Sequence, residues 1–239
     1  MSLLPLAIVG HGKMGRVVEQ MAPQHGFRVV ARFTSSNIAS LSTTTLVGAS
    51  TAIEFSTPAV AVENLKRLAS FGVQTVCGTT GWYEHLPQIR KAFEDADTAL
   101  LYGPNFSVGV NLFFQIVATA ASLIGRHPEY EAWGWEIHHS AKKDSPSGTL
   151  KSLELQMRTS GFTRPVSLSA SRAGTHVGTH EIGFDSPSDT ITLRHASKNR
   201  EGFARGALLA ARWIIGKKGV FEFREVLADL QTGKIAAGS

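Results

Sequence analysis

Short apolar runs alternate with helical patterns over about the first hundred residues, and this alternation restricts the fold more than any other feature. Between the first two runs, Met14, Val17, Val18 and Met21 recur at helical spacing. Strand–helix alternation of this kind favours a parallel, doubly wound sheet with helices on both faces. The predicted strands are residues 4–10, 28–33, 52–56, 73–77 and 98–102.

The pattern changes after Tyr102. Helices are predicted over residues 111–125 and 147–158, with a strand over residues 132–138 between them. Runs of strands with few crossovers then indicate a separate α+β layer. Its further predicted elements are antiparallel strands at residues 166–171, 178–184 and 190–196, followed by helices at residues 203–215 and 221–230.

A glycine-rich loop lies between the first predicted strand and the first predicted helix. Its residues are Gly10, His11, Gly12, Lys13, Met14 and Gly15. The G-x-G-x-x-G spacing lets the backbone approach a pyrophosphate, whose charge the helix N-terminus stabilises. A tight structural turn is the alternative for the glycines alone. The strand before the loop and the helix after it favour dinucleotide binding.

The end of the second predicted strand bears on which dinucleotide is bound. NAD-binding chains commonly place a carboxylate here, about 20 residues after the glycine loop, to accept from the ribose 2′-hydroxyl. Residues 32–36 contain none, and Thr34 is followed by two serines. Hydroxyls together with Lys13 and Arg32 suit a 2′-phosphate better, so we expect NADPH to be preferred and NADH to be a second usable cofactor. A plain polar turn is the alternative.

Two more loops follow predicted strands at the same sheet edge. Glycines and small hydroxyls allow close approach of a flat ligand, and an asparagine amide both donates and accepts. Each loop alone could be an ordinary turn. Their candidate cofactor-binding residues are Gly78, Thr79, Thr80, Gly103, Pro104, Asn105 and Phe106.

The segment from Glu136 to Thr149 holds the densest set of reactive groups. A histidine and a lysine here could supply a proton to a reaction. Ser145 before Pro146 is a plausible helix N-cap, which would leave the N–H groups of residues 147–149 free for a carboxylate. A surface histidine pair and a solvated lysine pair are the alternatives.

A metal site at His138 and His139 is not expected. Adjacent strand residues point to opposite faces, and no cysteine or aspartate completes a ligand set there. We therefore predict no metal.

Composition and charge indicate which kinds of partner and which cellular compartment to expect. The net charge of +5 suits an anionic cofactor and substrate, whereas the basic residues are too scattered to indicate nucleic acid. No apolar run reaches the length of a membrane span, and residues 3–9 lack the basic leader of a signal peptide. The single cysteine, Cys77, fits a reducing compartment, so a cytoplasmic protein is expected.

Several motifs together resemble the dihydrodipicolinate reductase family, also called 4-hydroxy-tetrahydrodipicolinate reductase. The resemblance covers nearly the whole chain. The most specific match is His138-His139-x-x-Lys142-x-Asp144-x-Pro146-Ser147-Gly148-Thr149. It is supported by the glycine-rich loop and by residues 54–58, 78–81, 104–111, 172–174, 177–180 and 203–207.

The resemblance implies a Rossmann-like domain at residues 1–106, to which residues 211–239 return. Residues 107–210 would form an α+β domain for substrate binding and homotetramer assembly, with an open mixed sheet. The implied reaction is hydride transfer from NAD(P)H to a cyclic unsaturated imine dicarboxylate in the diaminopimelate route to lysine.

The resemblance also assigns roles to single residues. His138 and Lys142 match the proton-transfer pair, with Lys142 as the donor. His139, Gly148 and Thr149 match substrate-carboxylate contacts, to which the predicted helix start adds Ser147. In two places this chain departs from the family pattern, because Thr34 and Thr179 stand where acidic residues are common.

Two other functions are compatible with parts of the sequence. The glycine-rich loop alone would also suit an NAD(P)-dependent dehydrogenase of amino or hydroxy acids. A nucleotide-sensing regulator that has lost its chemistry is a second alternative, although such a protein would be expected to lose some of His138, Lys142 and residues 147–149.

Overall fold

The computed structural model describes residues 2–233, and the chain divides into two compact units. The first unit consists of Met1–Val108 together with Glu201–Ser239, and the second is Gly109–Arg200. The chain therefore returns to the first unit at Glu201 rather than at residue 211. No helix within the described range is long and apolar enough to cross a membrane.

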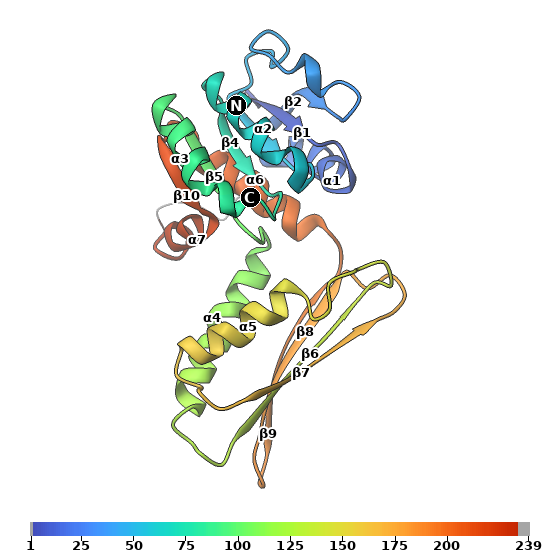
Figure 1. The fold of residues 1–239 in the computed structure, drawn as a ribbon, viewed down its shortest axis with the longest axis vertical. Coiled ribbons are helices and arrows are strands. Elements are labelled where there is room, and N and C mark those ends of the chain that lie inside the picture. The colour runs from blue at the N-terminus through green and yellow to red at the C-terminus, as the bar shows by residue number, and fades with distance from the viewer. Residues whose placement is uncertain (1, 234–239) are drawn as a thin grey trace. The chain divides into compact units, whose positions relative to one another are not determined.

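The first unit is built on a six-stranded parallel sheet in the order β10-β5-β4-β3-β1-β2 (Figure 1). This confirms the predicted doubly wound sheet. Because β2 and β3 lie on opposite sides of β1, the strand order reverses there, and the carboxyl ends of β1 and β3 form the edge where such sheets bind ligands. The strands are β1 (Leu4–Val9), β2 (Phe27–Phe33), β3 (Thr51–Glu54), β4 (Gln74–Cys77), β5 (Ala99–Tyr102) and β10 (Gly219–Glu222).

Helices cover both faces of this sheet (Figure 1). Leu6 and Ile8 of β1 are packed in one core with α1, α6 and α7, whereas Ala7 and Val9 point to the opposite core, which Leu68 of α2 enters. This two-residue period is what a central strand requires when both of its faces are buried. The helices are α1 (Lys13–Met21), α2 (Pro58–Ser70), α3 (Leu86–Asp95), α6 (Glu201–Trp213) and α7 (Phe223–Gln231).

One strand of the sheet was not predicted. The sequence predicted a helix over residues 221–230, but the segment begins as β10, and α7 starts only at Phe223. β10 is short and pairs in parallel with β5, with Val220 opposite Leu100. Four residues give too few alternations to reveal a strand from sequence, and the apolar periodicity of α7 runs on from it.

The second unit carries a four-stranded sheet in the order β7-β6-β8-β9, with α4 and α5 packed on one of its faces (Figure 1). β7 runs parallel to β6, and the other two pairs are antiparallel, which confirms the mixed sheet. The prediction that the strand from residue 166 is antiparallel was wrong, because α5 forms a crossover between β6 and β7. The elements are α4 (Val108–Ile124), β6 (Glu131–His138), α5 (Gly148–Thr159), β7 (Val166–Arg172), β8 (Gly178–Asp185) and β9 (Thr190–Ser197).

The central strand β6 alternates strictly between its two faces. Ala132, Gly134, Glu136 and His138 are buried, whereas the intervening side chains are only half-buried or exposed. Alternate residues of a strand share a face, so Glu136 and His138 lie on the same side of the sheet. A buried carboxylate and a buried imidazole thus enter a strand face that is otherwise apolar or glycine.

Candidate active site

The glycine-rich loop joins β1 to α1, as predicted. Gly10 has a φ of +91°, and a Cβ there would lie 2.2 Å from the carbonyl oxygen of Phe55 in the adjacent loop after β3. A Cβ on Gly15 would lie 2.3 Å from the carbonyl oxygen of Gly10. At Gly12 a Cβ would meet nothing within 4 Å, so this part of the loop is open to a ligand.

The helix that follows the loop is suited to an anion. α1 begins at Lys13 after an N-cap, Gly12, that has no side chain, and its first turn contains no acidic residue. Its positive end is therefore not neutralised locally. The loop and the helix start fit the pyrophosphate of a dinucleotide.

An ion-pair network behind the loop was not foreseen from sequence. Glu19 of α1 contacts His11 at 2.5 Å and accepts a hydrogen bond from Arg32 of β2. Arg32 is the leading cause of a lowered pKa for this carboxyl group. Arg32 thus has an internal counter-ion, whereas Lys13 on the loop is exposed. The sequence spacing of Glu19 from His11 and Arg32 does not predict these contacts, because Glu19 on α1 and Arg32 on β2 are brought together only by the fold.

Thr34 begins a compact turn after β2. The side chain of Asn37 accepts from the Thr34 backbone N–H at 2.6 Å and donates to the carbonyl oxygen of Arg32 at 3.0 Å. The Thr34 hydroxyl lies 2.7 Å from that of Ser36. The two hydroxyls are therefore gathered at the carboxyl end of β2, next in the sheet to the strand that carries the glycine-rich loop.

The loop after β4 is tied to the loop after β3. The Thr79 hydroxyl accepts from the Ser56 backbone N–H at 2.9 Å, and Thr79 is buried whereas Thr80 is exposed. A Cβ on Gly78 would lie 2.0 Å from the Phe55 ring. Gly78 is thus required by packing, whereas Thr80 is exposed and accessible to a ligand.

The loop after β5 combines core and surface residues. Phe106 is only 2% exposed, and its ring centroid lies 4.7 Å from that of Phe223. A Cβ on Gly103 would lie 2.9 Å from the Cβ of Phe223. Pro104 is exposed, and the Asn105 side chain accepts from the Ser107 N–H at 2.8 Å. Any contact of Phe106 with a cofactor would therefore involve its backbone.

In the second unit, the buried carboxylate of Glu136 lies at the centre of the reactive segment. One oxygen, Oε1, accepts from the Ser147 backbone N–H and from Arg172 Nη2, both at 2.8 Å. The other, Oε2, accepts from the Ser147 hydroxyl and lies 3.2 Å from His180 Nε2. It is also 3.7 Å from His138 Nδ1. No role of Glu136, Arg172 or His180 was predicted from the sequence, since their contact depends on the pairing of three strands.

These contacts shift the protonation of the cluster. Burial raises the pKa of Glu136, but hydrogen bonds from Ser147 and Arg172 outweigh it and hold the pKa below its usual value. Burial lowers the pKa of His138, against the opposing charge of Glu136. Burial and the neighbouring His138 lower the pKa of His180 to about 4. At neutral pH the cluster therefore holds one ionised carboxylate, Arg172 and two neutral imidazoles.

Lys142 and the start of α5 share a second carboxylate. The Lys142 ammonium lies 2.7 Å from one oxygen of Asp144, and its side chain is 25% exposed. Burial raises the pKa of Asp144, but the bond from Lys142 and the backbone N–H of Gly148 lower it overall. Asp144 thus lies against two of the groups expected to meet a substrate, while His139 is half-buried beside them in the chain.

The N-cap of α5 is Ser147, not Ser145 as predicted. The Ser147 hydroxyl accepts from the Leu150 N–H at 3.2 Å, and the helix begins at Gly148. Because the Ser147 N–H is already donated to Glu136, that N–H is not free for a ligand as expected. The expected anion site therefore reduces to the backbone N–H groups of Gly148 and Thr149.

The strand pairing also creates a cluster of possible metal ligands that the sequence did not indicate. One ligand atom each from Glu136, His138 and His180 lie within 4.8 Å of one another. A carboxylate has about four lone-pair sites, and Glu136 already uses them for Ser147, Arg172 and His180. A cation would have to displace these partners beside the positive charge of Arg172, so the cluster is better suited to proton chemistry.

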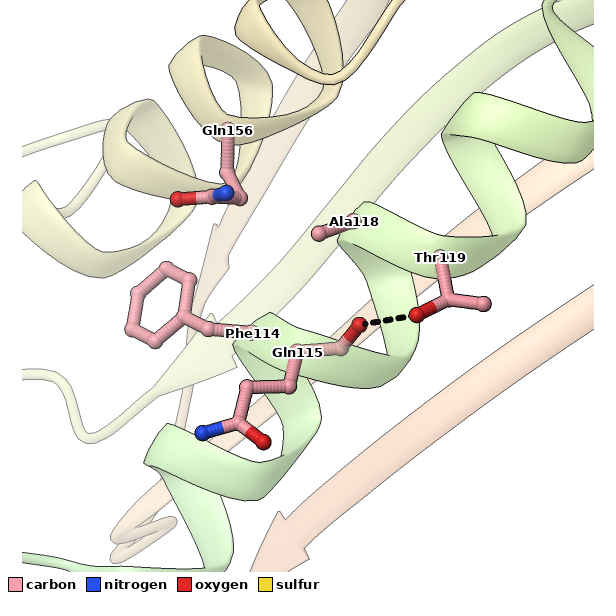
Figure 2. A pocket seen from close by; sticks show the side chains of 5 residues that line it. All are labelled: Phe114, Gln115, Ala118, Thr119 and Gln156. Atoms are coloured by element: carbon pink, nitrogen blue, oxygen red, sulfur yellow. Dashed lines mark hydrogen bonds between the residues drawn. The ribbon is translucent and has the colours of Figure 1, made fainter. Parts of the chain in front are cut away.

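A cavity of about 300 Å³ lies elsewhere in the second unit, between α4 and α5 (Figure 2). Its lining contains no titratable or nucleophilic side chain beyond Thr119, whose hydroxyl donates to the carbonyl oxygen of Gln115 at 3.0 Å. None of the predicted site residues lines it. The lining residues are Phe114, Gln115, Ala118, Thr119 and Gln156.

Comparison with known proteins matches both units to one family. Residues 4–106 match the family model "Dihydrodipicolinate reductase, N-terminus", and residues 109–227 match "Dihydrodipicolinate reductase, C-terminus". The match thus extends well beyond the glycine-rich loop, on which the alternative of an amino- or hydroxy-acid dehydrogenase rested.

Curated relatives and a solved structure agree with this. The 4-hydroxy-tetrahydrodipicolinate reductase of Christiangramia forsetii is 31% identical over 94% of this chain and 98% of its own. That of Archaeoglobus fulgidus is 31% identical over 90% of this chain and 96% of its own. The fold is similar to that of the dipicolinate-bound dihydrodipicolinate reductase from Paenisporosarcina sp. TG-14, with a TM-score of 0.76, 20% identity and coverage of 92% and 97% of the two chains. Over both of its units, this chain belongs to the dihydrodipicolinate reductase family.

Proposed function

We propose that this protein is a 4-hydroxy-tetrahydrodipicolinate reductase, which uses NAD(P)H to form tetrahydrodipicolinate in the diaminopimelate route to lysine. The observation that carries the proposal is the arrangement of His138, Lys142 and the start of α5 around two carboxylates, in a chain whose family is established over both units.

In this reaction a bound reduced nicotinamide supplies a hydride to the unsaturated imine. The residues proposed to hold it are 10–15 and the loops after β2, β4 and β5. The N–H groups of Gly148 and Thr149 at the start of α5 bind a substrate carboxylate, which replaces Asp144 at Gly148 and which the helix dipole stabilises. His139 is proposed as a further contact for the dicarboxylate.

Proton transfer completes the balance of the reaction. Loss of the 4-hydroxyl group as water gives the unsaturated imine, hydride addition to it leaves an enamine, and the enamine carbon takes up one proton. The Lys142 ammonium is the proposed donor, because its side chain is partly exposed and its present partner, Asp144, is a carboxylate that a substrate carboxylate can replace. His138 is buried and neutral at neutral pH, so it can take up a proton in turn.

NADPH is the proposed preferred cofactor. Lys13 is exposed at the glycine-rich loop, and the turn at Thr34 offers hydroxyls without a carboxylate. Arg32 would have to exchange its ion pair with Glu19 for a 2′-phosphate, which reduces its contribution. The proposed preference therefore depends mainly on Lys13.

The proposed function is tested by a coupled assay with enzymatically generated hydroxy-tetrahydrodipicolinate, run in parallel with NADPH and NADH. Loss of the reduced-nicotinamide absorbance that depends on the substrate supports the proposal, and a higher kcat/KM with NADPH supports the cofactor preference. No loss of absorbance with either cofactor would refute the reductase.

A cytoplasmic homotetramer is also proposed, assembled through the open face of the second unit's sheet. Trp133 and Trp135 are half-buried on the face of β6 opposite Glu136, where large aromatic side chains are typical of subunit contacts. Light scattering after size-exclusion chromatography tests the assembly, and a monomeric mass at assay concentration would contradict it.

A further inference from the structure

We propose that Glu136 is a positioning residue that couples the proton-transfer histidine, His138, to the carboxylate-binding start of α5. The inference rests on the proposed function, because it gives both of those groups their roles. Its basis is the geometry around one carboxylate that is 0% exposed and that contacts the helix start and side chains from three strands.

A fully buried charge is costly unless it is paired and hydrogen-bonded. Glu136 has both kinds of compensation, since Arg172 supplies the opposite charge and Ser147 donates through both its N–H and its hydroxyl. Arg172 also donates to the carbonyl oxygen of Asp144. Through Arg172, the Glu136 carboxylate is therefore linked to β7 and to the loop that carries Lys142.

On the helix side, Glu136 fixes the direction of the Ser147 hydroxyl. That hydroxyl accepts from the Leu150 N–H, so its single proton is available to donate, and Glu136 receives it. The Ser147 backbone N–H is held by the same carboxylate. Since Ser147 is the N-cap, these two bonds set where the following N–H groups of Gly148 and Thr149 lie.

On the histidine side, Glu136 faces the buried nitrogen of the imidazole. His138 is 7% exposed, and its Nδ1 has no hydrogen-bond partner among the described residues. Glu136 Oε2 lies 3.7 Å away, so a small movement on protonation would give a charge-assisted hydrogen bond. The carboxylate thus favours uptake of a proton by His138 and orients the ring.

The other charged and titratable groups that influence His138 do not substitute for Glu136. Lys142 and Arg172 disfavour its protonation, as does the neighbouring His180 when charged. Asp144 favours protonation, but its side chain is 55% exposed and its oxygens bind Lys142. Glu136 is the buried carboxylate in contact with both His138 and the helix start.

The test compares Glu136→Gln with Glu131→Gln, an exposed glutamate on the same strand. Three properties are measured: the pKa of His138 by NMR of its imidazole, the Kd of dipicolinate by calorimetry, and the pH profile of kcat/KM. In Glu136→Gln we expect a lower His138 pKa, dipicolinate binding weakened roughly 10-fold, and kcat/KM lowered roughly 30-fold or more. The limb of the profile that belongs to His138 should move to lower pH.

These expectations follow from the loss of one negative charge and from the replacement of one acceptor oxygen by a donor NH2 group, without loss of side-chain shape. Glu131→Gln should match the wild type in all three measurements. An unchanged His138 pKa, or dipicolinate binding and kcat/KM within about twofold of the wild type, would overturn the inference.

A second variant keeps the inference testable if Glu136→Gln does not fold. Ser147→Ala retains the ion pair of Glu136 with Arg172 and the bond from the residue 147 backbone N–H, but removes the hydroxyl that links Glu136 to the Leu150 N–H. It should weaken dipicolinate binding several-fold and leave the His138 pKa unchanged, while Ser147→Thr restores binding. Wild-type dipicolinate binding in Ser147→Ala would overturn the coupling.

Failure of the proposed function can be distinguished from failure of this inference. A wild-type protein without reductase activity would count against the function. The NMR pKa of His138 in wild type and Glu136→Gln requires no turnover, so it still decides whether the carboxylate acts on the histidine.

Discussion

In the proposed reaction, the Lys142 side chain donates the proton to the enamine carbon. Its replacement by alanine should lower kcat by roughly 10²–10⁴-fold, the usual range for a positioned proton donor. The neighbouring Lys143 is exposed and provides the control, since Lys143→Ala removes the same charge from the loop and should retain activity. Turnover of Lys142→Ala close to that of the wild type in the coupled assay would place the donor elsewhere.

Asp144 occupies the partners that a substrate carboxylate needs. Burial raises the pKa of its carboxyl group, but the bond from Lys142 and, to a smaller extent, the Gly148 N–H lower it overall. Asp144→Asn removes this competing charge and should tighten dipicolinate binding by up to about 5-fold, as expected for loss of a largely exposed ion pair. Glu154→Gln removes one charge from another part of α5 and serves as the control. Weaker binding by Asp144→Asn in calorimetry would mean that Asp144 orients Lys142.

At the residue scale, the sequence indicated the side chains with reactive groups but not what holds them. His138, Lys142, Gly148 and Thr149 lie within one short segment, so their spacing could be analysed directly. Arg172 and His180 reach Glu136 from β7 and β8, and no local pattern reports such a contact. The N-cap was placed two residues early because serine precedes proline at residue 145 and also stands at residue 147.

At the element scale, the packing of α6 in the first unit requires a glycine at residue 206. A Cβ on Gly206 would lie 1.7 Å from the carbonyl oxygen of Phe106, a backbone atom. Gly206→Ala should therefore destabilise the protein by about 1–3 kcal/mol, the range for overpacked sites. Gly202, on the same helix, would place its Cβ 3.7 Å from the Ser107 hydroxyl, an ordinary contact.

Gly202→Ala should thus leave the free energy of unfolding unchanged or slightly raised, because alanine favours a helix. Urea denaturation of both variants checks the contrast. Equal stabilities would indicate that α6 shifts along the sheet at little cost.

Long, strongly periodic elements were predicted well and short or tertiary-dependent ones were not. The alternation through β1 to β5 was sufficient for the parallel sheet, since each strand is followed by an apolar helix or loop. β10 has four residues and is stabilised by pairing with β5, and the direction of β7 depends on the crossover through α5. Neither property is present in the local pattern.

At the scale of the whole molecule, the buried histidines make stability depend on pH. The pKa of His180 is lowered to about 4 from an ordinary value of 6.5, chiefly by burial. Between these values the unfolded chain binds a proton that the folded chain does not. Stability is therefore complete above about pH 6.5 and falls as the pH is lowered towards 4, by at most about 1.4 kcal/mol per pH unit for this group.

Thermal denaturation between pH 7 and pH 4.5 checks this expectation. The Tm of the wild type should fall across this range, and the fall should be smaller in His180→Asn. His85→Asn, an exposed substitution, should follow the wild type. An equal fall in His180→Asn would assign the pH dependence to other groups.

The return of the chain at Glu201 has a consequence for the order in which the molecule is built. Residues 109–200 are continuous, so their core can close as soon as they have left the ribosome. The first unit can be completed only later, since α6 supplies residues to one of its cores and β10 supplies the last strand of its sheet. The loops proposed to bind the cofactor are therefore among the first segments synthesised, yet the sheet that supports them is completed last.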